Sequence, residues 1–173
     1  MNFTRSESVR RALIAAFSAI VIVASSATTA WAQGDTLLGT WKLIPEKSTF
    51  SSASSPVQSM TLKFSATDAG LMKHAKGMDA GGNPIETDSV VIADGRYHPV
   101  TGTSRFDSSS YTQLSDRNTV YLRQRGGTIV VVGSRVVSGD GKMLTFREKT
   151  VDKLGRETGK ALLVFEKQAS PQT

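Results

Sequence analysis

The chain has 173 residues, 39% of them hydrophobic, and its 21 Lys and Arg outnumber 15 Asp and Glu, which gives a formal net charge of +6. This length fits one domain with a core of its own. The complete absence of cysteine excludes disulfides, a cysteine nucleophile and acylation on cysteine, and the scattering of basic residues among acidic ones argues against a nucleic-acid-binding surface.

The first 32 residues have the features of a secretory signal peptide. Arg5, Arg10 and Arg11 precede the apolar run Ala12–Ala24, and the small-residue cleavage pattern "AWA" follows. The run is shorter than the roughly 20 residues of a membrane-spanning helix, so a retained anchor is disfavoured. We expect cleavage before Gln33 and export to the periplasm or exterior of a bacterium, by the general route in preference to the twin-arginine route.

Residues 33–168 alternate between segments rich in Val, Thr, Tyr, Phe and Leu and turn clusters such as "AGGN", "RGG" and "SGDGK". In "MTLKF", Met60, Leu62 and Phe64 share one face, which is the period of a half-buried strand. The expected strands are Leu38–Leu43, Val57–Ala66, Gly70–Met78, Ile85–Ala93, Tyr97–Pro99, Thr103–Ser109, Tyr111–Leu114, Thr119–Arg125, Thr128–Ser138, Lys142–Val151 and Lys160–Lys167.

These segments predict an all-β fold. About eight to ten antiparallel strands without covering helices must close on themselves or fold as a sandwich, and sequential hairpins favour a single up-and-down β-barrel. The expected organisation is a signal peptide at residues 1–32, the barrel domain at 33–168 and a disordered tail at 169–173.

The first predicted strand contains "GTWKL", in which Gly39 stands two residues before Trp41, and the last contains "VFEK". Together with the meander, these motifs resemble the lipocalin and fatty-acid-binding superfamily, the calycins. "GTWKLIPEKSTF", "DGRYHPVTG", "SDRNTV" and "VSGDGKMLTF" are similar to a group of small exported bacterial lipocalin-like proteins of largely uncharacterised function. The resemblance implies that the indole of Trp41 packs across the floor of the barrel.

Fatty-acid-binding proteins also carry an Arg-x-Tyr pair on the last strand, which binds the carboxylate of the ligand. The aligned positions hold Leu163 and Phe165, so no carboxylate clamp is expected there. An arginine for an anionic head group has to come from elsewhere, and Arg105, Arg123 and Arg135 are the candidates within predicted strands.

The motif "DGRYHPVTG" places Tyr97 and His98 between a turn and Pro99. These two side chains either line the mouth of the barrel and bind a ligand, or belong to a turn with one buried ring, which is the favoured interpretation. His74 and His98, the only histidines, are too far apart in sequence to show metal-ligand spacing, so we expect no metal and no other cofactor.

The segment "NTVYLRQRG" leaves two orientations open. Tyr121 and Arg123 share one face, whereas Val120 and Leu122 share the other. Hydrophobicity predicts that Val120 and Leu122 point inward, but a polar lumen would reverse this and make Tyr121 and Arg123 ligand-binding residues.

Arg135, in "TIVVVGSRVV", shares its face with Ile129, Val131 and Val137. It either anchors an anion inside the barrel or lies near the rim, with its stem packed and its head in solvent. The rim position is the favoured interpretation.

No catalytic motif is present: the chain lacks G-x-S-x-G, H-E-x-x-H and a phosphate-binding glycine loop. We therefore expect a protein that is not an enzyme. The favoured hypothesis is a barrel that binds a small hydrophobic or amphipathic molecule in its interior. Its candidate ligand-binding residues are Trp41, Tyr97, His98, Arg105, Tyr121, Arg123 and Arg135.

The alternative hypothesis is a solid barrel that acts as an envelope interaction or stress-protective module and binds a protein partner through its loops. The size of the inward side chains distinguishes the two hypotheses. Small residues such as Ala75 and Thr87 would leave room for a ligand, whereas Leu62, Phe64 and Phe146 packed across one another would fill the interior.

Overall fold

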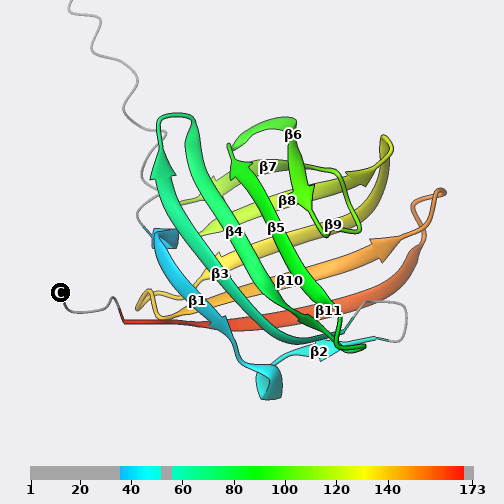
Figure 1. Cartoon of the computed structure of the whole chain (residues 1–173). Coiled ribbons are helices and arrows are strands. Elements are labelled where there is room, and N and C mark those ends of the chain that lie inside the picture. Colours follow the sequence, from blue (N-terminus) through cyan, green and yellow to red (C-terminus); the bar gives the residue numbers. More distant parts are fainter. Residues whose placement is uncertain (1–35, 52–55, 170–173) are drawn as a thin grey trace, which may run out of the picture.

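The computed structural model describes residues 36–51 and 56–169. The segment predicted as a signal peptide, residues 1–32, lies outside the described residues, as does the predicted tail apart from Ala169. The elements are β1 (Gly39–Leu43), the short 3₁₀-helix η1 (Pro45–Lys47), β2 (Thr49–Phe50), β3 (Val57–Thr67), β4 (Gly70–Asp79), β5 (Pro84–Val91), β6 (Asp94–Gly102), β7 (Ser108–Ser115), β8 (Asn118–Arg125), β9 (Thr128–Val137), β10 (Met143–Val151) and β11 (Glu157–Lys167), as Figure 1 shows.

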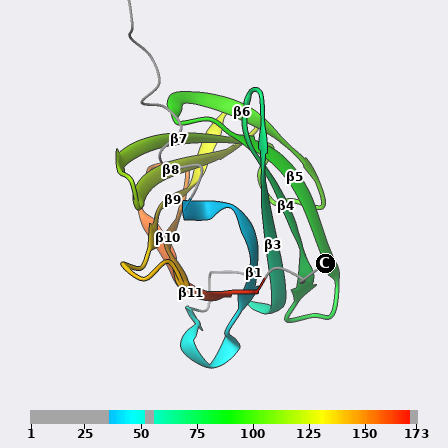
Figure 2. The same ribbon diagram turned by 90° about the vertical axis from the view of Figure 1, so that its left-hand side faces the viewer.

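The strands form one antiparallel sheet that closes on itself. From β3 to β11 each strand pairs with the next along the chain, and β1 closes the ring because it pairs with both β3 and β11. In Figure 2, which is turned by 90° from Figure 1, the strands form a ring around a common axis. The predicted all-β up-and-down barrel is confirmed, and in the described part of the chain ten strands, β1 and β3–β11, form its wall.

Two predicted segments differ from the observed strands. The segment Tyr97–Pro99 is the middle of a longer strand, β6, whereas most of Thr103–Ser109 is a loop that leads into β7. The regular pairing of β6 ends at Gly102, whose φ of 94° lies in a region that favours glycine and departs from strand geometry.

Trp41 closes one end of the barrel. Its side chain is fully buried, and its Nε1 donates a hydrogen bond to the carbonyl oxygen of Leu37 at 2.8 Å. Lys167 is the cross-strand neighbour of Trp41 on β11, and its Nζ atom lies 5.1 Å from the centre of the indole ring. The indole is therefore buried as the resemblance implies, and the short turn before β1 lies within the ring of strands in Figure 2.

Aromatic rings pack the middle of the barrel in a continuous row. Tyr111 and Tyr121 have ring centres 5.9 Å apart, Tyr121 and Phe146 6.1 Å, and Phe146 and Phe165 5.5 Å. Gly133 lies opposite Tyr121 in the register of β8 and β9, and a Cβ at this position would overlap the Tyr121 ring. A glycine is needed in this strand because the ring occupies the space of a side chain.

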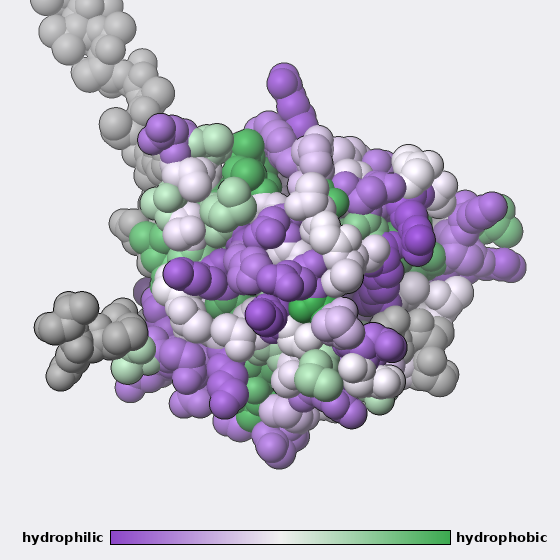
Figure 3. Space-filling model, in the orientation of Figure 1, coloured by the Kyte–Doolittle hydropathy of each residue, from purple (hydrophilic) through white to green (hydrophobic). Residues whose placement is uncertain are grey.

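The outer face of β3–β5 is polar. Lys63, His74 and Asp88 occupy one cross-strand row, and His74 Nδ1 lies 2.8 Å from Asp88 Oδ1. Figure 3 shows hydrophilic side chains across the middle of this face. The alternation of polar and apolar residues that predicted these strands therefore separates the solvent from the interior.

Candidate ligand-binding site

A cavity of about 260 Å³ occupies the end of the barrel opposite Trp41. Strands β3, β4, β5, β8, β10 and β11 contribute to its walls, and the loop at residues 103–106 borders it. The exposed residues Pro84 and Thr103 are part of its lining, so the cavity reaches the surface. Its apolar lining includes Phe50, Val57, Met60, Leu62, Ala75, Ile85, Phe146, Ala161, Leu163 and Phe165, and its polar lining includes Lys73, Thr87, Arg105, Arg123 and Glu148.

A buried ion pair forms one wall of this cavity. Arg123 Nη1 donates to Glu148 Oε1 at 2.6 Å, and the hydroxyl of Tyr121 donates to the same oxygen at 2.8 Å. Arg105 Nη2 lies 3.8 Å from the other carboxylate oxygen. The guanidinium of Arg123 also lies over the ring of Phe106, at 4.5 Å from its centre, so that both charge and ring hold it in place.

Electrostatics keeps this pair ionised. Burial by itself raises the pKa of Glu148, but the adjacent Arg123, the Tyr121 hydroxyl and Arg105 together lower that pKa below its ordinary value. Burial opposes the charge of Arg123 as well, and Glu148 overcomes it, so the pKa of Arg123 is raised. The pKa of Tyr121 is raised by burial and by the neighbouring carboxylate, which keeps this hydroxyl a donor.

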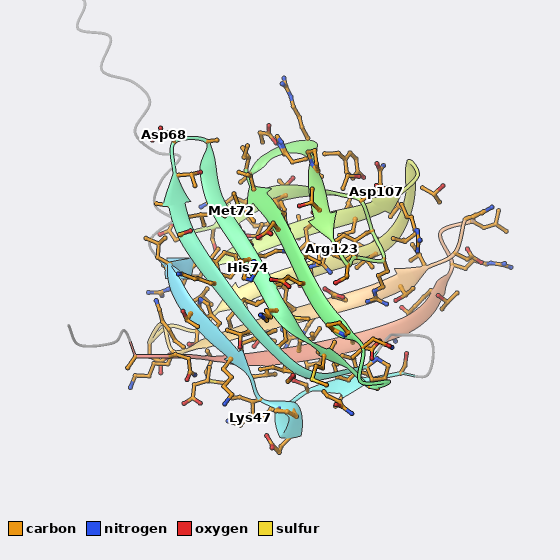
Figure 4. The ribbon with its side chains drawn as sticks, viewed as in Figure 1. Lys47, Asp68, Met72, His74, Asp107 and Arg123 are labelled. Atoms are coloured by element: carbon orange, nitrogen blue, oxygen red, sulfur yellow. The ribbon has the colours of Figure 1, made fainter. Side chains whose placement is uncertain are left out.

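Strand β8 turns the opposite face to the interior from the one that hydrophobicity predicts. Tyr121 and Arg123 are buried, whereas Val120 is 36% exposed, and Figure 4 shows Arg123 within the barrel. The prediction that Val120 and Leu122 point inward is therefore wrong. The physical reason for the reversal is that Glu148 lies on the inner face of β10 and neutralises the charge of Arg123, so the arginine can be buried.

Arg135 is not at the rim. Its side chain is 2% exposed, and its cross-strand neighbours Thr119 and Phe146 are also buried. The guanidinium lies 5.1 Å from the centre of the Tyr111 ring and 5.9 Å from that of Phe64. The favoured rim interpretation is wrong because β9 turns this face to the interior from Val131 to Val137, with Arg135 in the middle of that stretch.

Lys73 is an interior cation that the sequence reasoning missed. It is 5% exposed and lines the cavity from β4. Burial lowers its pKa, and the like charges of Arg123 and Arg135 lower it further, against the opposing influence of Tyr111. The available signal was alternation, because Lys73 shares a strand face with Leu71 and Ala75, both buried.

Glu148 and Tyr111 were also missed as site residues. Glu148 shares the face of Leu144 and Phe146 in the predicted strand, and all three are buried. Tyr111 lies directly opposite Tyr121 in the register of β7 and β8. A charged residue on an otherwise apolar strand face was the signal for Glu148, whereas no pattern around Tyr111 predicted its neighbours.

The structure brings some predicted site residues together and separates others. Arg105, Tyr121 and Arg123 meet at Glu148. Tyr97 is 38% exposed, and His98 Nε2 lies 3.0 Å from Asp94 Oδ1 on the same strand, β6.

Tyr97, His98 and Arg135 are not part of the cavity lining, and Trp41 lies at the opposite end of the barrel. The positions of the carboxylate clamp on the last strand, Leu163 and Phe165, are buried and apolar. The interior cations therefore come from β4, β8 and β9.

The described residues contain neither a cluster of metal-ligand side chains nor a membrane-spanning helix. Among residues 36–51 and 56–169, no three His, Asp or Glu side chains gather closely enough to hold a metal ion. Within the same ranges, no helix has the length and hydropathy that a membrane span requires.

A scan of protein-family models finds no match to this chain, and a search of curated proteins finds none either. Solved structures share its fold. The S-type phycobiliprotein lyase CPES from Guillardia theta superposes with a TM-score of 0.53 at 10% identity, over 80% of this chain and 92% of that chain. This chain therefore shares the barrel fold of that lyase.

Two further solved structures resemble this barrel. A protein of unknown function of the DUF3598 family from Nostoc punctiforme has a TM-score of 0.51 at 14% identity, over 78% of this chain and 49% of that chain. This chain thus spans about half the length of that protein. Lobster apocrustacyanin A1 is more distant, with a TM-score of 0.40 at 9% identity, over 79% of this chain and 63% of that chain.

Proposed function

We propose that this chain is an exported, non-enzymatic binding protein that holds one small amphipathic molecule inside its barrel. The observation that carries the proposal is the cavity of about 260 Å³, whose lining is mostly apolar and includes a few fixed polar groups. Binding sites for small molecules have this composition and volumes of about 300–1,000 Å³. The volume here favours a compact ligand.

The distribution of side chains along the barrel axis supports a binding role over a purely structural one. The half near Trp41 is filled by Phe64, Leu144 and the aromatic row. In the other half Met60, Leu62 and Ala75 line the cavity, and Phe146 and Phe165, at the end of the aromatic row, border it. A barrel with a purely structural role is expected to be filled in both halves, because a cavity loses favourable packing contacts.

The experiment is a binding titration of the neutral fluorophore N-phenylnaphthylamine, whose emission rises in an apolar environment. We expect saturable binding of one molecule per chain. Ala75→Phe, which fills the cavity from β4, should abolish binding, whereas Ser65→Phe on the exposed face of β3 should leave it unchanged. Circular dichroism would verify that both variants fold.

No binding to the wild-type barrel, together with no small molecule retained in native mass spectrometry of the purified chain, would refute the proposal and favour the interaction module. Recovery of a chemically altered fluorophore after incubation would refute the non-enzymatic role. Both readouts are independent of the identity of the natural ligand.

Export is tested separately. When the full chain is expressed in a bacterium, we expect the protein in the periplasm or medium, with Gln33 as its first residue by N-terminal sequencing. A cytoplasmic protein that retains residues 1–32 would refute the export part of the proposal and leave the binding role untouched.

A further inference from the structure

The interior of the barrel holds more positive than negative charge. Lys73, Arg123 and Arg135 are 5%, 8% and 2% exposed, whereas Glu148, at 8%, is the one carboxylate among the buried side chains of the described residues. Three cations against one anion leave an excess of two positive charges. Glu148 is already engaged by Arg123 at 2.6 Å, so it does not compensate the other two cations.

Arg135 has no acceptor for its hydrogen-bond donors. Its Nε, Nη1 and Nη2 atoms are all buried without a hydrogen-bond partner among the described residues. The rings of Tyr111 and Phe64 offer only weak attraction to the guanidinium, at 5.1 and 5.9 Å. A buried charge without a partner is costly, so a guanidinium in this state indicates a site that an outside acceptor completes.

Lys73 connects this guanidinium to the cavity. It lines the cavity from β4 and interacts electrostatically with both Tyr111 and Arg135. The hydroxyl of Tyr111 is also buried and lies next to Lys73. An ammonium, a hydroxyl and a guanidinium from three different strands are thus grouped together, with Lys73 in the cavity wall and Tyr111 and Arg135 behind it.

We infer that the ligand is an amphipathic anion whose carboxylate, sulfonate or phosphate group binds between Lys73 and Arg135 while its apolar body fills the cavity. This inference rests on the proposed function and adds the charge of the ligand to it. An anionic group accepts from several donors at once and neutralises the excess charge, and such charge-assisted bonds are strong in a buried site. The site differs from a clamp on the last strand, because β11 contributes only apolar side chains there.

The titration of Tyr111 gives the site a dependence on pH. Burial alone raises the pKa of Tyr111, but Lys73 of β4, Arg123 of β8 and Arg135 of β9 lower this pKa to about 7. Tyr121, the other titratable group that packs against it, has a raised pKa and stays neutral. Above pH 7 the tyrosinate supplies negative charge itself, so affinity for an anion should fall as the pH rises.

The test compares two probes with the same aromatic skeleton, neutral N-phenylnaphthylamine and anionic anilinonaphthalenesulfonate. We expect the sulfonate to bind the wild-type barrel at least about tenfold more tightly, as one charge-assisted hydrogen bond would give. Arg135→Met removes the charge but keeps the length of the side chain. It should abolish the preference for the sulfonate and leave binding of the neutral probe within about twofold.

A purely structural role for Arg135 predicts a different result. Replacement of an unpaired buried cation by an apolar residue should leave the melting temperature of the ligand-free barrel unchanged or raise it, whereas loss of a structural arginine would lower it. Lys73→Met is the second variant and should reduce the same preference. Arg147→Met, on the exposed face of β10, is the matched control and should change neither affinity.

Equal affinities of the wild-type barrel for both probes would overturn the inference and leave the proposed function standing. An undiminished preference for the sulfonate in both Arg135→Met and Lys73→Met would overturn it as well. If neither probe binds, the proposed function itself fails.

Discussion

Replacement of Trp41 by alanine tests whether the indole holds the barrel together. The side chain is fully buried, so the variant loses the whole apolar contact of the largest core residue and leaves a cavity at the floor. Substitutions of this kind cost about 3–5 kcal/mol of unfolding free energy. The lost hydrogen bond to Leu37, at 2.8 Å, accounts for about 1 kcal/mol of that range.

The assay is urea denaturation of the ligand-free protein followed by far-ultraviolet circular dichroism. Trp41→Phe separates packing from hydrogen bonding, because it keeps an aromatic ring but leaves the Leu37 carbonyl without its donor. We expect Trp41→Phe to lose about 1–3 kcal/mol, clearly less than Trp41→Ala. A loss below about 1 kcal/mol for Trp41→Ala would refute the reasoning, since removal of a fully buried ring costs more unfolding free energy than that.

Three other perturbations test the interior. Gly133→Ala places a Cβ against the adjacent tyrosine ring, so we expect a loss of about 1–3 kcal/mol in the same denaturation assay. Glu148→Gln leaves Arg123 without a counter-charge and should cost about 3 kcal/mol or more at neutral pH. In the folded protein the pKa of Glu148 is lowered from 4.5. Ionised Glu148 therefore stabilises the fold above pH 4.5, and this stabilisation is lost as the pH falls through the folded pKa. The wild-type protein and Glu148→Gln should thus converge in unfolding free energy in acid. Tyr111 has a pKa near 7, so tyrosinate absorbance should grow through neutral pH in the ligand-free barrel and be absent in Tyr111→Phe. Since the pKa of this tyrosine is higher in the unfolded chain, its ionisation adds to the free energy of unfolding above pH 7, and this gain is lost as the pH falls.

Each of these predictions has a control on the same chain. Gly139 has an ordinary φ and open space around it, so Gly139→Ala should not destabilise the barrel. Glu157 makes only exposed ion pairs, which contribute little to stability, so Glu157→Gln should change the acid dependence of stability far less than Glu148→Gln. Tyr97→Phe, at a partly exposed ring, should retain the absorbance change at neutral pH. If a control variant gives the same result as the interior variant with which it is matched, the argument for that interior residue is contradicted.

Hairpin geometry was predictable because it depends on neighbours in the chain. The pair Asp140-Gly141 forms the expected tight turn between β9 and β10. Gly141 has a φ of 71°, and its amide donates to the carbonyl of Ser138 at 2.9 Å. Both features follow from residues within a few positions of one another, for which the conformational preferences of glycine and aspartate are sufficient.

The inward face of β8 was not predictable in this way. Both faces of the segment alternate equally well, and hydrophobicity favoured Val120 over Arg123. The interaction that decides the matter joins Arg123 to Glu148, 25 residues further along the chain. Only the register of β8, β9 and β10 brings these two side chains to the same place.

The amino-acid pattern by itself determined that this chain forms consecutive antiparallel strands, because alternation and turn residues are local properties. It also determined which residues share a face of each strand. The tertiary structure alone decided which face is inside, where the barrel is hollow and which charges lack partners. Those outcomes depend on the sum of charges and volumes contributed by strands far apart in sequence, and no single segment contains that sum.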